Sequence, residues 1–207
     1  MRPLLPAGFV LMTLAPWLLL THAGRRHIGL QAPRSWLALG PAALAGSAAA
    51  LACFALGMLL YGDSADHWFT TIAASYRGMM NTSGFSTLTL HLVFTLPALL
   101  FSPIGEEIFF RGILQRALEQ RVSARASTLT ECAAFGLVHL CHHGMAYGAA
   151  GLSLRPVSGA LWVAAMFLAA LLFATIRQRT NSLFPAMAAH AAFNATMNVV
   201  IFAFLWH

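Results

Sequence analysis

The chain has 207 residues, of which 59% are hydrophobic and only 9% charged, and its mean hydropathy is +0.72. Soluble domains are closer to half apolar and a quarter charged, so the composition excludes an ordinary soluble globular protein. All basic residues are arginines, and the formal net charge is +6. Arginines that flank membrane spans explain this charge better than nucleic-acid binding does, so we expect no nucleic-acid partner.

Six apolar runs near twenty residues long predict membrane-spanning helices. The expected spans are Leu4–Thr21, Leu37–Tyr61, Leu88–Ile104, Cys132–Ala150, Val157–Ile176 and Leu183–Trp206. The segment Ser64–Ser83 is too polar to span and is expected to form a short interfacial helix. The first run resembles a signal peptide, but His22-Ala23-Gly24-Arg25 is a poor cleavage site, so we expect it to be retained. The fold class is therefore all-α, a polytopic transmembrane helical bundle that forms a single membrane domain over residues 1–207.

The arginines indicate how these spans are oriented. Three loops that share one side carry Arg25, Arg26, Arg34, Arg116, Arg121, Arg125, Arg177 and Arg179. The opposite side carries only Arg2, Arg77 and Arg155. Because positively charged loops stay in the cytoplasm, we expect the Arg-rich loops there and both termini outside.

Glu106 and Glu107 stand side by side at the end of the third span. Ionisable groups within lipid cost on the order of 2.5–3.5 kcal/mol each, so a chain that keeps them there usually uses them. On a helix, Glu107 and Arg111 lie about 40° apart, a good ion-pair spacing, whereas Glu106 lies about 140° from Arg111. This geometry predicts a structural Glu107–Arg111 pair and leaves Glu106 free to act. The alternative is that both acids only cap a helix that begins or kinks at Pro103 and Gly105.

Histidine side chains interrupt the fourth expected span. His139 has neighbours three and four residues later in His142 and His143. This spacing can bind a metal on one helical face, but the same residues could equally face water at the end of the span.

The last expected span has a polar face of its own. His190 and Asn194 are four residues apart, and Asn198 continues the same face. The ordinary role of such groups is an interhelical hydrogen bond worth about 0.6–2 kcal/mol. Together with Glu106 and His139, however, they come from three helices near the predicted cytoplasmic side, which favours one shared site.

Three motifs carry a resemblance to a known family: Glu106-Glu107-x-x-x-Arg111, Phe135-x-x-x-His139 and His190-x-x-x-Asn194. In this order they resemble the CAAX-protease and bacteriocin-processing (CPBP) family of intramembrane endopeptidases. The resemblance covers about Pro103–Asn198, with a catalytic core expected over about residues 88–206. It implies a multi-pass protease, a hydrolase, in a bacterial inner (plasma) membrane.

The resemblance also implies a role for each motif residue. Glu106 would be the general base that activates water, and His139 would hold and orient that water. His190 and Asn194 would face the developing oxyanion, while Glu107 and Arg111 would support the site. Possible additional site residues are Asn198, His142 and His143.

The cofactor is left open, because the family has been described as metal-dependent. Glu106, His139 and His190 could supply three ligands to a zinc ion. The chain has no His-Glu-x-x-His, however, and Asn194 has no natural place in such a site. We therefore favour a glutamic-type protease with no cofactor.

The expected partners are membrane lipids and a protein or peptide substrate with a hydrophobic or lipidated segment. A prenylated tail, a bacteriocin leader and a C-terminal sorting anchor all fit that description. The alternative functions are a non-catalytic membrane scaffold or immunity-type protein of the same fold, and a proton or metal transporter.

Overall fold

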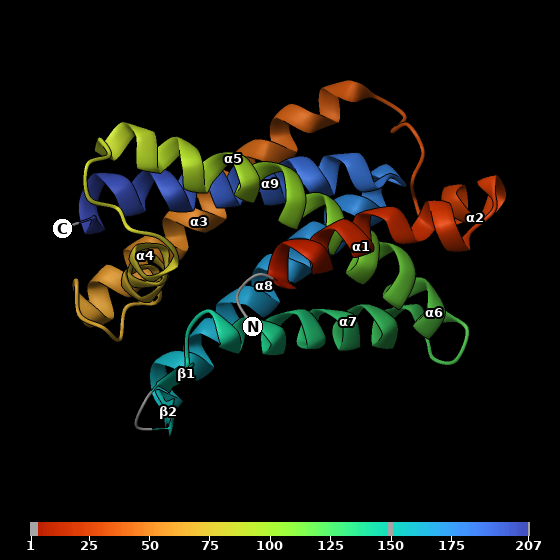
Figure 1. Ribbon diagram of the computed structural model, residues 1–207. Helices are drawn as coiled ribbons and strands as arrows, with labels where there is room; N and C mark the ends of the chain where they lie inside the picture. Colours follow the sequence, from red (N-terminus) through yellow and green to blue (C-terminus); the bar gives the residue numbers. More distant parts are fainter. Residues whose placement is uncertain (1–3, 149–150, 207) are drawn as a thin grey trace.

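The computed structural model describes residues 4–148 and 151–206, which form a helical bundle with one short β-hairpin (Figure 1). Its helices are α1 (Leu4–Leu19), α2 (His22–His27), η1 (Trp36–Ala38), α3 (Leu39–Tyr61), α4 (Trp68–Met79), α5 (Thr87–Glu106), η2 (Glu107–Leu114), α6 (Gln115–Glu119), α7 (Ala124–Val138), η3 (His139–Cys141), α8 (Pro156–Thr180), α9 (Leu183–Val200) and η4 (Ile201–Leu205). Strands β1 (Met145–Gly148) and β2 (Gly151–Leu154) pair antiparallel. The predicted all-α bundle is confirmed.

Within the described residues, four helical segments are long and apolar enough to cross a membrane. They are Trp36–Tyr61, Thr87–Glu119, Pro156–Thr180 and Leu183–Leu205. These segments correspond to the second, third, fifth and sixth predicted spans. α1 is apolar but has only 16 residues. Large apolar side chains such as Leu44 and Leu59 on α3 and Leu88 on α5 remain exposed, as expected for surfaces that face lipid.

The third span is longer than predicted. The expected start or kink at Pro103 and Gly105 does not end the helix, which continues to Glu119. Instead, the hydrogen-bond pattern changes from α to π at Glu107 and remains π as far as Leu114. A π-helix has a wider turn than an α-helix, and such turns are frequent at functional sites.

The fourth predicted span, Cys132–Ala150, is wrong. The helix there is α7, which begins earlier and ends at Val138, and the chain then turns through η3 into the hairpin. Gly144, at φ +110°, takes a backbone conformation that favours glycine, and its carbonyl accepts the Arg155 N–H. Hydropathy did not predict a helix over the first half of α7, because many of its side chains are polar. In the structure several of these side chains are buried and form hydrogen bonds. For example, the Ser127 hydroxyl donates to the Gln115 carbonyl.

The three Arg-rich loops gather at one end of the bundle, while α4 and the hairpin lie at the other (Figure 1). Backbone and side-chain contacts join the loop after α2 to the turn between α8 and α9. The Leu183 N–H donates to the Gly29 carbonyl at 2.9 Å, and the Ser182 hydroxyl donates to the Gln31 carbonyl at 2.7 Å. Residues about 150 positions apart thus fix the level at which α9 begins.

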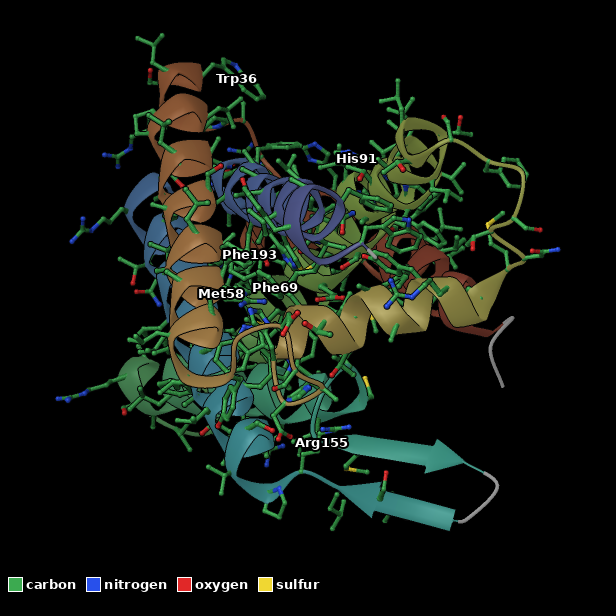
Figure 2. The ribbon with its side chains drawn as sticks, turned by 90° about the vertical axis from the view of Figure 1, so that its left-hand side faces the viewer. Trp36, Met58, Phe69, His91, Arg155 and Phe193 are labelled. Carbon is green, nitrogen blue, oxygen red and sulfur yellow. The ribbon has the colours of Figure 1, made fainter. Side chains whose placement is uncertain are left out.

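The core lies between α3, α4, α8 and α9, and Figure 2 shows Phe69 and Phe193 pointing into it. The segment Ser64–Ser83, predicted as a short interfacial helix, contains α4, and its residues Trp68, Phe69 and Ile72 are buried in protein. α3 and α9 lie close together at Gly46. A Cβ added there would lie 2.7 Å from the Ala189 carbonyl carbon, so only glycine fits beside His190's helix at this point.

Candidate active site

A buried ion cluster joins η2, α7 and α9. Arg111 Nη1 lies 3.2 Å from Glu107 Oε1 one turn earlier, and Arg111 Nε lies 3.2 Å from Glu131 Oε1 on α7. His190 Nδ1 lies 2.9 Å from the same Glu107 oxygen. Because an ionised carboxylate only accepts hydrogen bonds, His190 donates from Nδ1. A neutral His190 therefore has its lone pair on Nε2.

Aromatic rings enclose this cluster. The Arg111 guanidinium carbon lies 4.2 Å from the centre of the Phe135 ring, and Phe173 stacks on His190 at 4.9 Å. Both phenylalanines are buried. A guanidinium over a ring face is stabilised electrostatically, and more strongly where water is excluded. The rings also restrict the orientation of the His190 imidazole.

Glu106 occupies a different environment from Glu107. The Ser102 hydroxyl, one turn earlier on α5, donates to Glu106 Oε1 at 2.8 Å. Glu106 Oε2 is buried with no hydrogen-bond partner among the described residues, and it lies 3.9 Å from His190 Nε2. No ion pair between Glu106 and Arg111 occurs in the described part of the chain. The second carboxylate oxygen is thus available to a further partner.

His139 follows α7 and is held at both its ring and its backbone. Its Nδ1 lies 2.7 Å from the Phe135 carbonyl oxygen, which only accepts, so Nδ1 donates and Nε2 of the neutral ring keeps a lone pair. Trp162 of α8 donates from its indole to the His139 carbonyl at 3.0 Å. The His139 and His190 rings both contact Phe135, with centroids 4.3 and 5.9 Å away. Phe135 therefore brings the second and third motifs together.

Asn194 lies one helical turn after His190 and is half-buried. Its Nδ2 donates to the Ala98 carbonyl on α5 at 3.1 Å. An amide nitrogen has two hydrogens, so the second remains to be donated elsewhere. The bond to Ala98 holds this donor on the face of α9 that meets α5, the helix of Glu106.

A family model described as "Rce1-like: Type II CAAX prenyl endopeptidase Rce1-like" matches residues 87–196. The match covers more than half of the chain and includes Glu106, His139, His190 and Asn194. The chain belongs to this family. At family level it is therefore a CAAX-type intramembrane endopeptidase, and with its four long apolar helices it is an integral membrane protein. No curated protein and no solved structure matches the chain.

In this family member, two residues predicted as possible additions lie outside the cluster. Asn198 is fully buried between helices: its amide donates to Thr95 on α5 and its oxygen accepts from Tyr76 on α4. His143 bonds Thr71 on α4 and Ser158 on α8, both at 2.9 Å. Burial, with the nearby Arg155 charge, lowers the pKa of His143 to about 4. Both residues connect helices.

His142, by contrast, lies next to the site. Its ring meets the His139 ring edge-on at 5.1 Å, and its side chain is exposed.

The zinc alternative requires Glu106, His139 and His190 to converge on one point. Residues 4–148 and 151–206 contain no group of three or more His, Cys, Asp or Glu side chains close enough to hold one ion.

Sequence reasoning missed Glu131, Ser102 and Phe173. Glu131 is one of six acids in the chain, and it precedes Phe135 and His139 at intervals of four. That spacing places all three on one helix face, so an acid in this register was the available signal. Ser102 precedes Glu106 by four residues in the same way. Nothing in the sequence distinguishes Phe173 from the other phenylalanines.

Proposed function

We propose that the protein hydrolyses a peptide bond with a water molecule activated by Glu106. The observation that carries this proposal is the buried, unpartnered Glu106 Oε2, 3.9 Å from His190 Nε2. Leaving a buried acceptor unpaired costs about 1–3 kcal/mol, which a bound water or substrate group would offset. Glu107 is instead engaged by Arg111 and His190, so the two acids have separate roles.

In the proposed reaction, water lies between Glu106 Oε2 and the lone pair on His139 Nε2. Glu106 takes a proton as the water oxygen forms a bond to the scissile carbonyl carbon. The carbonyl electron pair moves to its oxygen and gives a tetrahedral oxyanion. Glu106 then returns the proton to the amide nitrogen as the C–N bond breaks, which yields a carboxylic acid and an amine.

Asn194 and His190 are the proposed oxyanion donors. The second hydrogen on Asn194 Nδ2 serves this purpose in any protonation state, and one such donor is worth about 3 kcal/mol. His190 already donates from Nδ1 to Glu107, so it can donate from Nε2 only as an imidazolium. Asn194 is therefore the donor whose hydrogen bond does not depend on the protonation of His190.

The proposed mechanism uses no metal. We expect full activity after exhaustive chelation and less than stoichiometric zinc in the purified protein. One tightly bound zinc per chain, lost in His139→Ala, would contradict this.

The proposed substrate is a protein or peptide with a hydrophobic or lipidated segment, in a bacterial inner (plasma) membrane. Exposed apolar side chains flank the site: Phe101 precedes Ser102, and Leu137 and Val138 precede His139. A segment arriving from the lipid phase would meet these side chains first. A prenylated tail, a leader and a C-terminal sorting anchor share this chemistry.

The experiment is a peptide mass-spectrometry map of membrane and secreted proteins in the native host, with wild type compared with Glu106→Gln. We expect one protein or a small set to keep an uncut terminus in the variant. Glu107→Gln is the control: it should lower the melting temperature, because Arg111 and His190 lose the negative charge that they share, whereas Glu106→Gln should not.

Identical maps, with Glu106→Gln protein present at normal levels, would overturn the proposal. The scaffold and transporter alternatives would then account better for the fold.

A further inference from the structure

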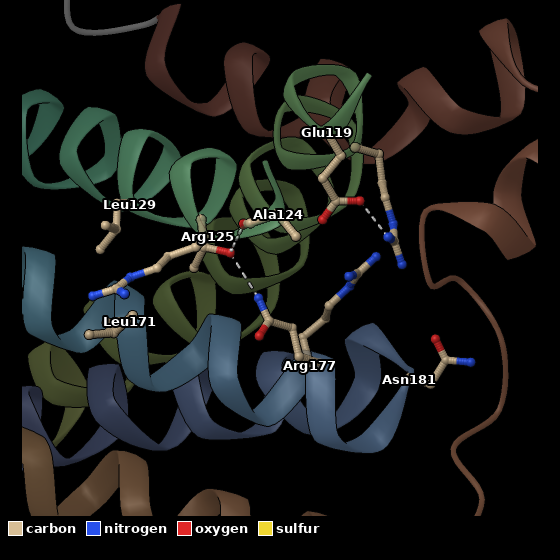
Figure 3. A pocket seen from close by; sticks show the side chains of 10 residues that line it. Glu119, Ala124, Arg125, Leu129, Leu171, Arg177 and Asn181 are labelled. Carbon is tan, nitrogen blue, oxygen red and sulfur yellow. Dashed lines mark hydrogen bonds and ion pairs between the residues drawn. The ribbon is translucent and has the colours of Figure 1, made fainter. Parts of the chain in front are cut away.

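A basic groove of about 640 Å³ lies between α6, α7 and the end of α8, at the Arg-rich end of the bundle (Figure 3). Three arginines line it, Arg116, Arg125 and Arg177, with Glu119 as the acid among its lining residues. None of the groups assigned to catalysis lines this groove. The groove is therefore separate from the candidate active site.

The charges in the groove do not balance. Glu119 forms an ion pair with Arg116. In the described part of the chain, no carboxylate lies within ion-pair distance of Arg125 or Arg177. Two positive charges are thus left for an anion.

Arg177 is buried with few polar partners. It is only 2% exposed, its Nη2 donates to the Ile28 carbonyl at 3.3 Å, and its Nε has no hydrogen-bond partner among the described residues. In Figure 3 its guanidinium reaches through the groove toward Glu119. A buried charge without a counter-ion is costly, so a bound anion would stabilise Arg177 where it lies.

The other end of the groove is apolar. Leu129 and Leu171 line it, and Figure 3 shows the Arg125 guanidinium lying between them. Leu129 is 40% exposed. The groove therefore offers cationic groups beside an apolar wall, which suits an amphiphile better than a free ion.

We propose that this groove binds the phosphate of an anionic phospholipid headgroup from the cytoplasmic leaflet, with an acyl chain along Leu129 and Leu171. Basic pockets between membrane helices on the cytoplasmic side suit such headgroups. The groove lies where α7 begins and α8 ends, the level at which headgroups are found if the Arg-rich loops are cytoplasmic. The proposal does not depend on the catalytic mechanism.

The test is native mass spectrometry of the full-length protein in neutral detergent. Phosphatidylglycerol, phosphatidylcholine and inorganic phosphate are the three probes. We expect phosphatidylglycerol to remain bound and to bind at least about fivefold more tightly than phosphatidylcholine. Arg125→Gln should weaken phosphatidylglycerol binding about fivefold, since one arginine near the membrane surface contributes about that much. Arg177→Gln should weaken it further.

Arg179→Gln is the matched control, because Arg179 is exposed on the same helix end and does not line the groove. It should bind phosphatidylglycerol as wild type does. Equal weakening by Arg179→Gln would mean diffuse attraction to net charge and would overturn the proposal. Inorganic phosphate binding as tightly as phosphatidylglycerol would replace the lipid with a free anion, which also overturns it. If Arg177→Gln fails to fold, the exposed Arg125→Gln decides the question.

Discussion

Arg111 and Glu131 join η2 to α7 through a contact of 3.2 Å between Nε and Oε1, and both side chains are fully buried. Arg111 thus has one carboxylate from its own helix and one from a different helix. Through Glu107, the same guanidinium fixes the acceptor that orients His190. Glu131 therefore acts on the candidate site through Arg111, without being one of the motif residues.

We expect Glu131→Gln to destabilise the protein by about 1–3 kcal/mol, because Arg111 Nε loses its carboxylate partner on α7 while Glu107 still pairs with the guanidinium. The melting temperature in detergent measures this effect. Glu119→Gln is the control, because its pair with Arg116 is partly exposed and should contribute at most about 1 kcal/mol. Equal losses of stability in the two variants would show that the Arg111–Glu131 contact stabilises the protein no more than a partly exposed ion pair does.

Asn194 and Asn198 make a matched pair one helical turn apart. Asn194→Ala should lower the rate of cleavage about 100-fold with little effect on stability, because it removes the proposed oxyanion donor. Asn198→Ala should lower the melting temperature, because Thr95 and Tyr76 each lose a buried partner, and should leave the rate per folded molecule unchanged. Kinetics and melting curves of both variants separate these roles. If Asn198→Ala lowered the rate and Asn194→Ala lowered only the melting temperature, Asn198 would be the oxyanion donor in place of Asn194.

Gly46→Ala should cost about 1–3 kcal/mol, because the new Cβ would collide with the Ala189 backbone and force α9 away from α3. Gly40→Ala in the same helix is the control, since nothing lies within 4 Å of its added Cβ. It should be neutral or slightly stabilising. Similar melting temperatures for both variants would mean that the α3–α9 contact is loose.

Acid should destabilise the end of the bundle that carries α4 and the hairpin, through His143. Its folded pKa, about 4, lies below the ordinary value of 6.5, because burial disfavours the charged ring and Arg155 repels it. The unfolded chain therefore takes up the proton first, and stability present above pH 6.5 is lost as the pH falls toward 4. The expected loss is about 1–3 kcal/mol. His143→Gln should reduce the dependence of the melting temperature on pH in this range, and an unchanged slope would contradict this assignment.

Local spacing was sufficient to predict the contacts that lie within one helix. The interval of four between Glu107 and Arg111 predicted their ion pair, and the same argument kept Glu106 away from Arg111. The apolar runs located α1, α3, α8 and α9 to within a few residues. These features depend only on helix geometry and composition, which the sequence contains directly.

Local spacing and composition did not predict the contacts between helices. The ion pair of Glu131 with Arg111 joins residues twenty positions apart. The first half of α7 was not predicted as part of a span, because polar residues such as Ser127, Thr128 and Glu131 are usually exposed to solvent. Their partners lie on α6, α8 and η2 and make burial acceptable. The π-helical turn at Glu107 likewise has no marker in the sequence. Tertiary contacts thus determined what local preference could not.

The bond between Glu107 and His190 spans 83 residues, and His190 lies in α9. A chain still being synthesised has inserted Glu106, Glu107 and Arg111 long before α9 exists. Until then Glu107 has no His190 imidazole to bind, and the Asn194 amide is absent. The proposed site is therefore complete only once α9 has packed against α3 and α5, and a growing chain would lack both proposed oxyanion donors until then.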